Sequence, residues 1–170
     1  MSDLTQALGI GRQSLYGTFG DKRRLFLECM DRYVDSVLKF AIFDPLALEG
    51  SPLQNVGRVL DAWEGYAKSA DFRGCLLGKS LGELGQREPA LDRVLRSKLD
   101  RMEQAFERAL TLAKKQGELL PSADPRMLAR ALTTFAQGAG MVCQVWREPE
   151  VIHQTLQGAR ALLAAFSVAR

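Results

Sequence analysis

The chain has 170 residues, the size of one ordinary domain or of a small module fused to a larger one. It contains 26 Leu and 20 Ala but only 9 Val and 3 Ile, a balance that favours helix formers over β-branched strand formers. With 46% hydrophobic and 25% charged residues it can bury a core, which excludes a disordered chain. We therefore expect an all-α protein.

The net charge of +3 is too small to indicate a nucleic-acid partner by itself. The longest apolar run, Ala161 to Phe166, is far too short to cross a membrane, and the first residues lack a secretion signal. The cysteines Cys29, Cys75 and Cys143 are odd in number and widely spaced, which suits reduced thiols and no zinc site. These features predict a cytoplasmic protein without a metal or cofactor.

Helical periodicity runs through most of the chain. Two short helices are expected at about 3–9 and 12–18, followed by a long one at about 22–40. The stretch 41–51 is the only plausible boundary between two parts of the chain. It divides the chain into a first part at 1–40 and a second part at 41–170.

Prolines mark the helix starts in the second part, because proline is well tolerated at the first helical position. Pro52 follows Ser51 and Pro125 follows Asp124, and Ser and Asp are good N-caps. Pro89 and Pro149 each follow a glutamate, whereas Pro45 and Pro121 are expected in connections. The helices expected in this part span about 52–69, 75–86, 89–117, 125–146 and 150–168.

The first forty residues are the most informative. Gly9 separates the two short helices and suits the positive φ of a sharp turn. Leu15 and Phe19 lie four residues apart on the second helix, so they should face inward, together with Leu4, Leu8 and Ile10. Two short helices joined by such a turn are typical of a helix-turn-helix, whose second helix enters the major groove of DNA.

The outward face of the second helix suits that function. Arg12 and Gln13 can bond base edges or phosphates, and the hydroxyl side chains can bond phosphates. From residue 11 to residue 24 the local net charge is +3, equal to that of the whole chain. The alternative is a surface hairpin with a solvated basic end. The candidate DNA-binding residues are Arg12, Gln13, Ser14, Tyr16, Thr18 and Lys22.

The run from Leu8 to Lys22, with its Gly-Ile-Gly turn, Leu-Tyr pair, Phe19 and Asp-Lys helix start, resembles the TetR family of bacterial transcriptional regulators. The motif covers about residues 4–33, and the rest of the chain agrees in layout. The resemblance implies that Ser14, Tyr16 and Lys22 bind phosphates. It also implies that Arg12, Gln13 and Thr18 read the DNA sequence.

The chain departs from the family pattern at its beginning. The family's DNA-binding domain has three helices, and the first, about twenty residues long, precedes the position of Leu4. Only three residues precede Leu4 here. We expect either an internal start or a truncation. Without that helix, Leu4, Leu8, Leu15, Phe19 and Phe26 should lack part of their cover.

The last two helices are the candidate dimer interface. Gly138 and its small neighbours permit close helix approach, and two such helix pairs would form a four-helix bundle. The alternative is a pair of core helices within a monomer. The residues expected at the interface are Gly138, Val142, Trp146, Ile152, Leu156 and Leu163.

The middle helices should enclose a pocket for a small, mostly apolar ligand, although each residue could equally be ordinary core. Lys79, Gln137 and Gln144 are possible polar contacts. The ligand-binding candidates are Trp63, Tyr66, Cys75, Phe106, Phe135 and Met141.

Cys75 follows Gly74 at an expected helix start, with Lys79 one turn on, a setting that favours the reactive thiolate. A redox or electrophile sensor is therefore one hypothesis, and a small buried hydrophobe is the other. The stretch 74–80 is not a phosphate-binding loop, because it has three residues between its glycines and no preceding strand.

No residue set predicts an enzyme. His153, the only histidine, has no evident carboxylate or nucleophile partner, and carboxylates such as Glu83 and Glu88 suit solvated helix faces. The sequence therefore predicts a homodimeric, ligand-responsive repressor that a small apolar ligand releases from a palindromic operator. The alternatives are a dimeric ligand-binding module that does not bind DNA and a thiol-based sensor that uses Cys75.

Overall fold

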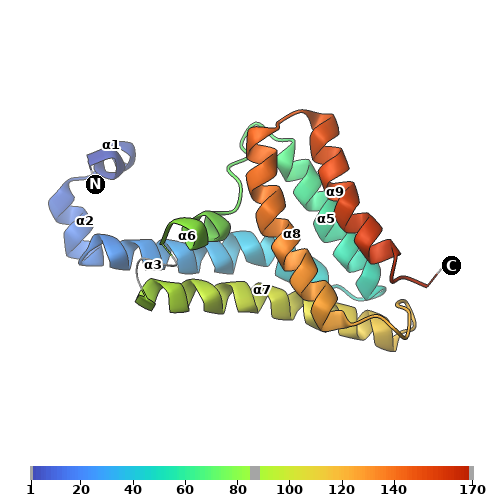
Figure 1. Ribbon diagram of the computed structural model, residues 1–170. Helices are drawn as coiled ribbons and strands as arrows, with labels where there is room; N and C mark the ends of the chain where they lie inside the picture. Colours follow the sequence, from blue (N-terminus) through green and yellow to red (C-terminus); the bar gives the residue numbers. More distant parts are fainter. Residues whose placement is uncertain (1, 85–88, 169–170) are drawn as a thin grey trace. The chain divides into compact units, whose positions relative to one another are not determined.

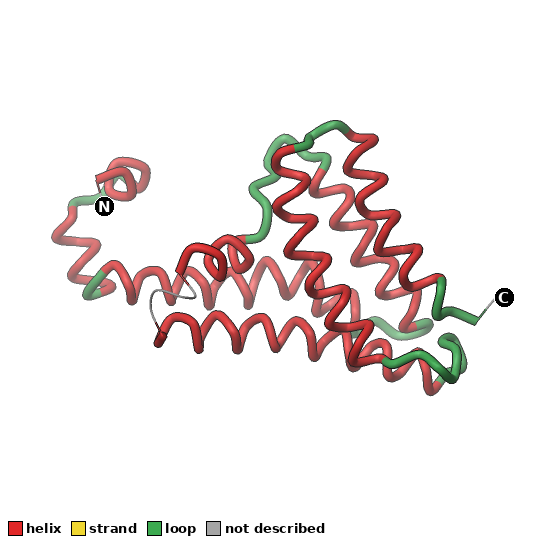
Figure 2. The backbone as a smooth tube through the Cα atoms, in the orientation of Figure 1, coloured by secondary structure: helices red, strands yellow, loops and turns green. Residues whose placement is uncertain are grey.

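A computed structural model describes residues 2–84 and 89–168. Within these ranges every regular element is a helix, the helices are joined by loops (Figure 2), and one isolated bridge pairs Leu119 with Ser167, which confirms the all-α expectation. The chain divides into two compact units, Met1–Val37 and Leu38–Arg170. The boundary expected from the sequence lay at 40/41.

The first unit contains α1 (Ser2–Leu8), α2 (Arg12–Phe19) and α3 (Lys22–Arg32). The turn after α1 is a Schellman motif: Gly9 has a φ of 65°, and the N–H of Ile10 donates to the carbonyl of Thr5 at 3.2 Å. Gly20 ends α2 with a φ of 77°. The glycines of the motif therefore sit where the chain needs positive φ.

The expected helix at 22–40 changes its winding part-way. α3 continues into η1 (Tyr33–Phe43), a π-helical segment that crosses the unit boundary. Buried residues recur at every fourth position here, namely Met30, Val34, Leu38, Ile42 and Leu46. In a pure α-helix, residues four apart drift by about 40° per step. The wider π winding turns less per residue and offsets that drift, so the five stay on one buried face.

The second unit holds the longer helices (Figure 1). They are α4 (Asp44–Leu46), α5 (Pro52–Ala67), α6 (Leu76–Leu84), α7 (Pro89–Lys115), α8 (Pro125–Val145) and α9 (Pro149–Ala164). The four predicted proline starts are confirmed. Pro45, by contrast, lies inside the short α4 rather than in a connection.

Side-chain caps explain where two of these helices begin. Ser51 Oγ accepts the N–H of Gln54 at 3.1 Å at the start of α5. Asp124 Oδ1 accepts the N–H groups of Arg126 and Met127 at the start of α8. Glu148, before α9, makes no side-chain cap. Glu88, before α7, lies outside the described residues.

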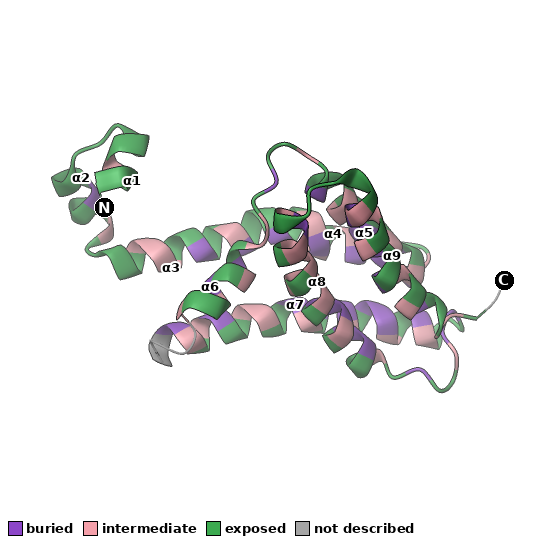
Figure 3. Ribbon diagram, turned by 45° about the horizontal axis from the view of Figure 1, so that its top comes forward, coloured by how far each residue is buried: buried purple, intermediate pink, exposed green. Residues whose placement is uncertain are grey.

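The core of the second unit lies where α7 and α8 pack along each other and where α5, α8 and α9 lie side by side (Figure 1). Phe106 is fully buried, and its ring meets that of Trp63 edge-on at 6.0 Å. Buried side chains concentrate on the inner faces of these helices (Figure 3). By contrast, α1 has no buried residue and α2 has only Leu15.

Candidate functional site

The second helix of the first unit presents the predicted DNA-binding side chains. Its one buried residue, Leu15, holds it in place, while all six candidates are exposed. The candidates are Arg12, Gln13, Ser14, Tyr16, Thr18 and, at the start of α3, Lys22. Tyr16 is 42% exposed, although its ring is large and apolar. An exposed polar helix of this kind can lie in a major groove.

Local hydrogen bonds already engage some side chains of this region. The Thr18 hydroxyl donates to the carbonyl of Ser14 at 3.0 Å, so its proton is already engaged within α2. Asp21 caps α3 by accepting the N–H of Arg24 at 2.7 Å. The Arg24 guanidinium pairs with Glu28 at 3.3 Å on the same helix. Lys22, next to this cap, is exposed.

The apolar cover of α1 and α2 is incomplete. Leu4, Leu8 and Ile10 are 40%, 57% and 39% exposed. The expectation of partial cover is confirmed for Leu4 and Leu8, and Ile10, for which it was not stated, is exposed as well. The expectation is wrong for Leu15, which is only 1% exposed, while Phe19 and Phe26 are half-buried.

The predicted ligand-binding residues occupy several different environments. Phe106 is in the core, and Trp63, Cys75 and Phe135 are half-buried. Tyr66 is 46% exposed: its ring meets Phe72 edge-on at 5.1 Å, and its hydroxyl accepts the N–H of Arg73. Only Trp63 and Phe106 are brought into ring contact with each other.

Met141 corrects one expectation. It is 62% exposed on the outside of α8, so within one subunit it does not line an interior pocket. The neighbouring Val145 and Trp146 are also exposed, at 76% and 54%. These three residues form one apolar patch at the end of α8, which we call the α8 patch.

The predicted dimer residues separate into two groups. Ile152, Leu156 and Leu163 are 0%, 1% and 6% exposed, so they belong to the subunit's own core and have little area for a partner. Gly138 and Trp146 are exposed, and Val142 is half-buried. Helical periodicity alone could not separate the two groups, because core-facing and partner-facing residues on such helices share one period.

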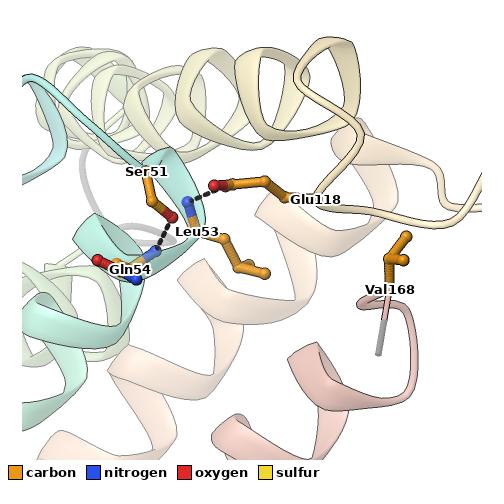
Figure 4. Close-up of a pocket in the computed structure, with 5 residues that line it drawn as sticks. All are labelled: Ser51, Leu53, Gln54, Glu118 and Val168. Atoms are coloured by element: carbon orange, nitrogen blue, oxygen red, sulfur yellow. Dashed lines mark hydrogen bonds between the residues drawn. The ribbon is translucent and has the colours of Figure 1, made fainter. Parts of the chain in front are cut away.

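A surface pocket of about 320 Å³ lies at the start of α5 (Figure 4). Its lining includes Ser51, Leu53, Gln54, Glu118 and Val168. Glu118 is buried, and its Oε2 accepts the N–H of Leu53 at 2.9 Å, while Ser51 accepts that of Gln54. These polar groups cap the start of α5, so we assign the pocket a structural role.

Within residues 2–84 and 89–168, every helix is too short or too polar to span a bilayer. No group of three or more His, Cys, Asp or Glu side chains in those ranges is arranged to hold a metal ion.

Comparison with known proteins identifies the second unit. Residues 52–159 match the family model described as Tetracyclin repressor-like, C-terminal domain. The chain belongs to the TetR family. The shared part comprises α5 to most of α9, the helices that build the core described above.

Among curated proteins, the chain is similar to YezE, an uncharacterized HTH-type transcriptional regulator of Bacillus subtilis (strain 168). The two are 32% identical over 120 residues, which cover 70% of this chain and 61% of YezE. The match thus spans about three fifths of that relative's length.

Two solved structures show the same fold. One is a TetR-family regulator from Agrobacterium tumefaciens, with a TM-score of 0.85 and 17% identity, covering 98% of this chain and 86% of that one. The other is a cysteine mutant of CifR complexed with 26bp double-strand operator DNA. Its TM-score is 0.80 at 23% identity, covering 92% of this chain and 84% of CifR. At these identities the likeness concerns the fold alone.

Proposed function

We propose that this chain is a cytoplasmic, non-enzymatic repressor that binds a palindromic operator as a homodimer and is released by a small, mostly apolar ligand. The observation that carries the proposal is the exposed polar face of α2, held by the buried Leu15. The first unit carries the helix-turn-helix, and the second unit belongs to the family of regulators. CifR, a neighbour in fold, is a regulator crystallised with operator DNA.

The dimer is proposed to form through the α8 patch. Met141, Val145 and Trp146 are exposed apolar residues at the end of α8, and Met141 and Val145 lie one turn apart. Gly158 and Ala161 on α9 are small and exposed, which permits a partner helix to approach closely. A two-fold axis through these helices would give each subunit the same contacts, and a palindromic operator needs that symmetry.

Release by a ligand is a shift between two populations of the dimer. A ligand that binds the second unit lowers DNA affinity only if it prefers the state in which the two recognition helices no longer match successive major grooves. We propose that the effector site lies among α5 to α8, where Trp63 and Phe106 meet.

The direct test is DNA binding by the purified chain. Fluorescence anisotropy with duplexes from the region upstream of its own gene should reveal one preferred palindrome and a salt-dependent affinity. Tyr16→Phe and Lys22→Ala should weaken binding to all sequences. Equal, salt-insensitive binding to every duplex, or none, would overturn the repressor proposal.

A dimeric ligand-binding module that does not bind DNA is the second candidate. Exposed Leu4, Leu8 and Ile10 favour it, because incomplete cover weakens the packing of α1 and α2. Amide hydrogen exchange separates the candidates. Slow exchange in α2 supports the repressor, whereas free exchange in α2 beside a protected α8 supports the module.

A thiol-based sensor that uses Cys75 is the third candidate. Cys75 is half-buried next to Gly140 of α8, close to the effector region, whereas Cys29 is exposed and Cys143 is buried. Burial raises the pKa of the Cys143 thiol, which makes it a poor nucleophile. The sensor hypothesis requires Cys75 to be alkylated faster than the exposed Cys29 near neutral pH. Faster reaction of Cys29 would exclude it.

A further inference from the structure

Two buried polar side chains on α8 have no hydrogen-bond partner. Thr133 is 3% exposed, and its hydroxyl oxygen is unpartnered within the described part of the chain. Gln137, one turn later, is half-buried as a residue, but both Oε1 and Nε2 of its amide are buried and unpartnered there. Buried polar groups in native proteins are nearly always paired, so two such groups on one helix face need an explanation.

The packing of α6 makes room for this amide. A Cβ at position 78 would overlap Oε1 of Gln137, so a glycine is needed there for the amide to keep its place. Gly82, one turn further along α6, has nothing within 4 Å of such an added Cβ. The close approach of α6 to the Gln137 amide is therefore local to position 78.

The neighbouring charged and polar groups are already engaged. Arg130, one turn before Thr133, forms a bidentate pair with Glu103 at 3.0 to 3.2 Å. Gln144, two turns after Gln137, donates to the carbonyl of Arg73 at 2.6 Å. Lys79 of α6 is the exception, since it is exposed. The unpartnered groups, Thr133 and Gln137, are neutral, so they offer a buried ionic ligand no opposite charge.

We propose that Gln137 and Thr133 are the hydrogen-bonding anchor of the effector site, and that the effector is an uncharged molecule carrying a carboxamide-like edge. The amide of Gln137 offers donors and an acceptor side by side, which match the carbonyl and N–H of an amide or lactam. The Thr133 hydroxyl supplies one further bond. The inference rests on the proposed function, in that the second unit binds an effector, and it adds the polar chemistry of that effector.

Ordered water is the competing occupant, because water can also satisfy a buried amide. Three probes of similar size separate the two cases: benzamide, benzoate and toluene. At millimolar concentrations, benzamide should shift the Gln137 side-chain amide signals in ¹H–¹⁵N NMR spectra of the full chain and raise its Tm. Benzoate and toluene should bind at least tenfold more weakly, because one brings a charge and the other lacks the polar edge.

Substitutions test which residues are responsible for benzamide binding. Gln137→Leu should keep or raise the Tm, since it removes an unpaired amide, and should weaken benzamide binding at least tenfold. Thr133→Val should weaken it less. Gly78→Ala should also abolish the response by displacing the amide, whereas Gly82→Ala, the matched control on the same helix, should bind benzamide like the parent chain.

The outcomes are decisive. If benzamide does not shift the Gln137 signals, or if the three probes bind equally, then the amide binds only structural water and the inference is wrong. Equal binding by Gly78→Ala and Gly82→Ala overturns it as well. Because these measurements contain no DNA, benzamide binding without operator binding would refute only the repressor function. An effector that releases DNA equally from the parent chain and Gln137→Leu would refute only the anchor.

Discussion

Glu64 on α5 and His153 on α9 form a contact of 2.8 Å between Oε1 and Nδ1. The same carboxylate receives Lys68 Nζ at 2.7 Å and Arg160 Nη1 at 2.9 Å. The sequence predicted no carboxylate partner for His153. That expectation is wrong because the partner comes from a helix 89 residues earlier, a separation at which sequence spacing carries no information.

This cluster predicts a pH dependence of stability. Hydrogen bonds from Lys68, His153 and Arg160 lower the pKa of Glu64 from 4.5 to about 2. Because the pKa is lower in the folded chain, the ionised carboxylate stabilises the fold above about pH 4.5. That contribution is lost as the pH falls from 4.5 toward 2.

Glu64→Gln should therefore destabilise the chain at pH 7 by about 1–3 kcal/mol, and the difference should shrink toward zero near pH 2. Urea unfolding at a series of pH values measures it. Glu103→Gln, which breaks the pair with the 67% exposed Arg130, should cost only about 0–1 kcal/mol. A pH-independent difference for Glu64→Gln would show that the carboxylate acts through packing alone.

Substitutions at the six DNA-binding candidates should change DNA binding in different ways. Gln13→Ala should change base preference at one position of each half-site by about 1–3 kcal/mol and leave the salt dependence unchanged. Lys22→Ala should weaken binding to every sequence and reduce the salt slope by about one. Anisotropy titrations against a set of single-base operator variants at several salt concentrations separate the two. Similar behaviour of both variants would contradict the assigned roles.

Within this set, Thr18 is expected to contribute least through its hydroxyl. That hydroxyl donates to the carbonyl of Ser14 at 3.0 Å, so it must break a bond within α2 before it can donate to a phosphate. Thr18→Val, which keeps the shape, should change operator affinity by less than Tyr16→Phe in the same titration. A larger loss for Thr18→Val would show that the side chain turns toward the DNA.

The α8 patch gives a prediction about assembly. Val145→Glu places a charge where 76% of a valine is exposed in the single chain, so the folded subunit should tolerate it. In a dimer packed through this patch the charge would be buried without a partner, and the dimer should dissociate at micromolar concentrations. Analytical ultracentrifugation measures the mass. Leu112→Glu, a change at a 48% exposed leucine on α7, is the control and should leave the mass unchanged.

The sequence was most informative where local chemistry decides the structure. Proline starts and the positive φ of Gly9 depend on neighbouring residues, and the structure has them as predicted. Fold class and family followed from the same local signals. The π winding of η1 could not be predicted from the sequence, because the prediction assumed 3.6 residues per turn throughout.

The sequence was least informative where packing between helices determines which residues are buried. Ile152 and Met141 are both apolar residues on the last helices, yet one is fully buried and the other is 62% exposed. Only the packing of α5 against α9 makes that distinction. For the same reason, the sequence could not distinguish Gln137 from the other possible polar contacts. Its unpartnered amide and the close approach of Gly78 to that amide depend on the fold.

Helix capping supplies the last prediction. Asp124 and Glu148 both precede a proline that starts a helix, but only the side chain of Asp124 accepts backbone N–H groups, those of Arg126 at 2.9 Å and Met127 at 3.3 Å. Asp124→Ala should therefore lower the free energy of unfolding by about 1 kcal/mol, whereas Glu148→Ala should change it by less than about 0.5 kcal/mol. Chemical denaturation at neutral pH measures both. Equal losses would mean that the cap of α8 acts through general helix-end charge rather than through its two hydrogen bonds.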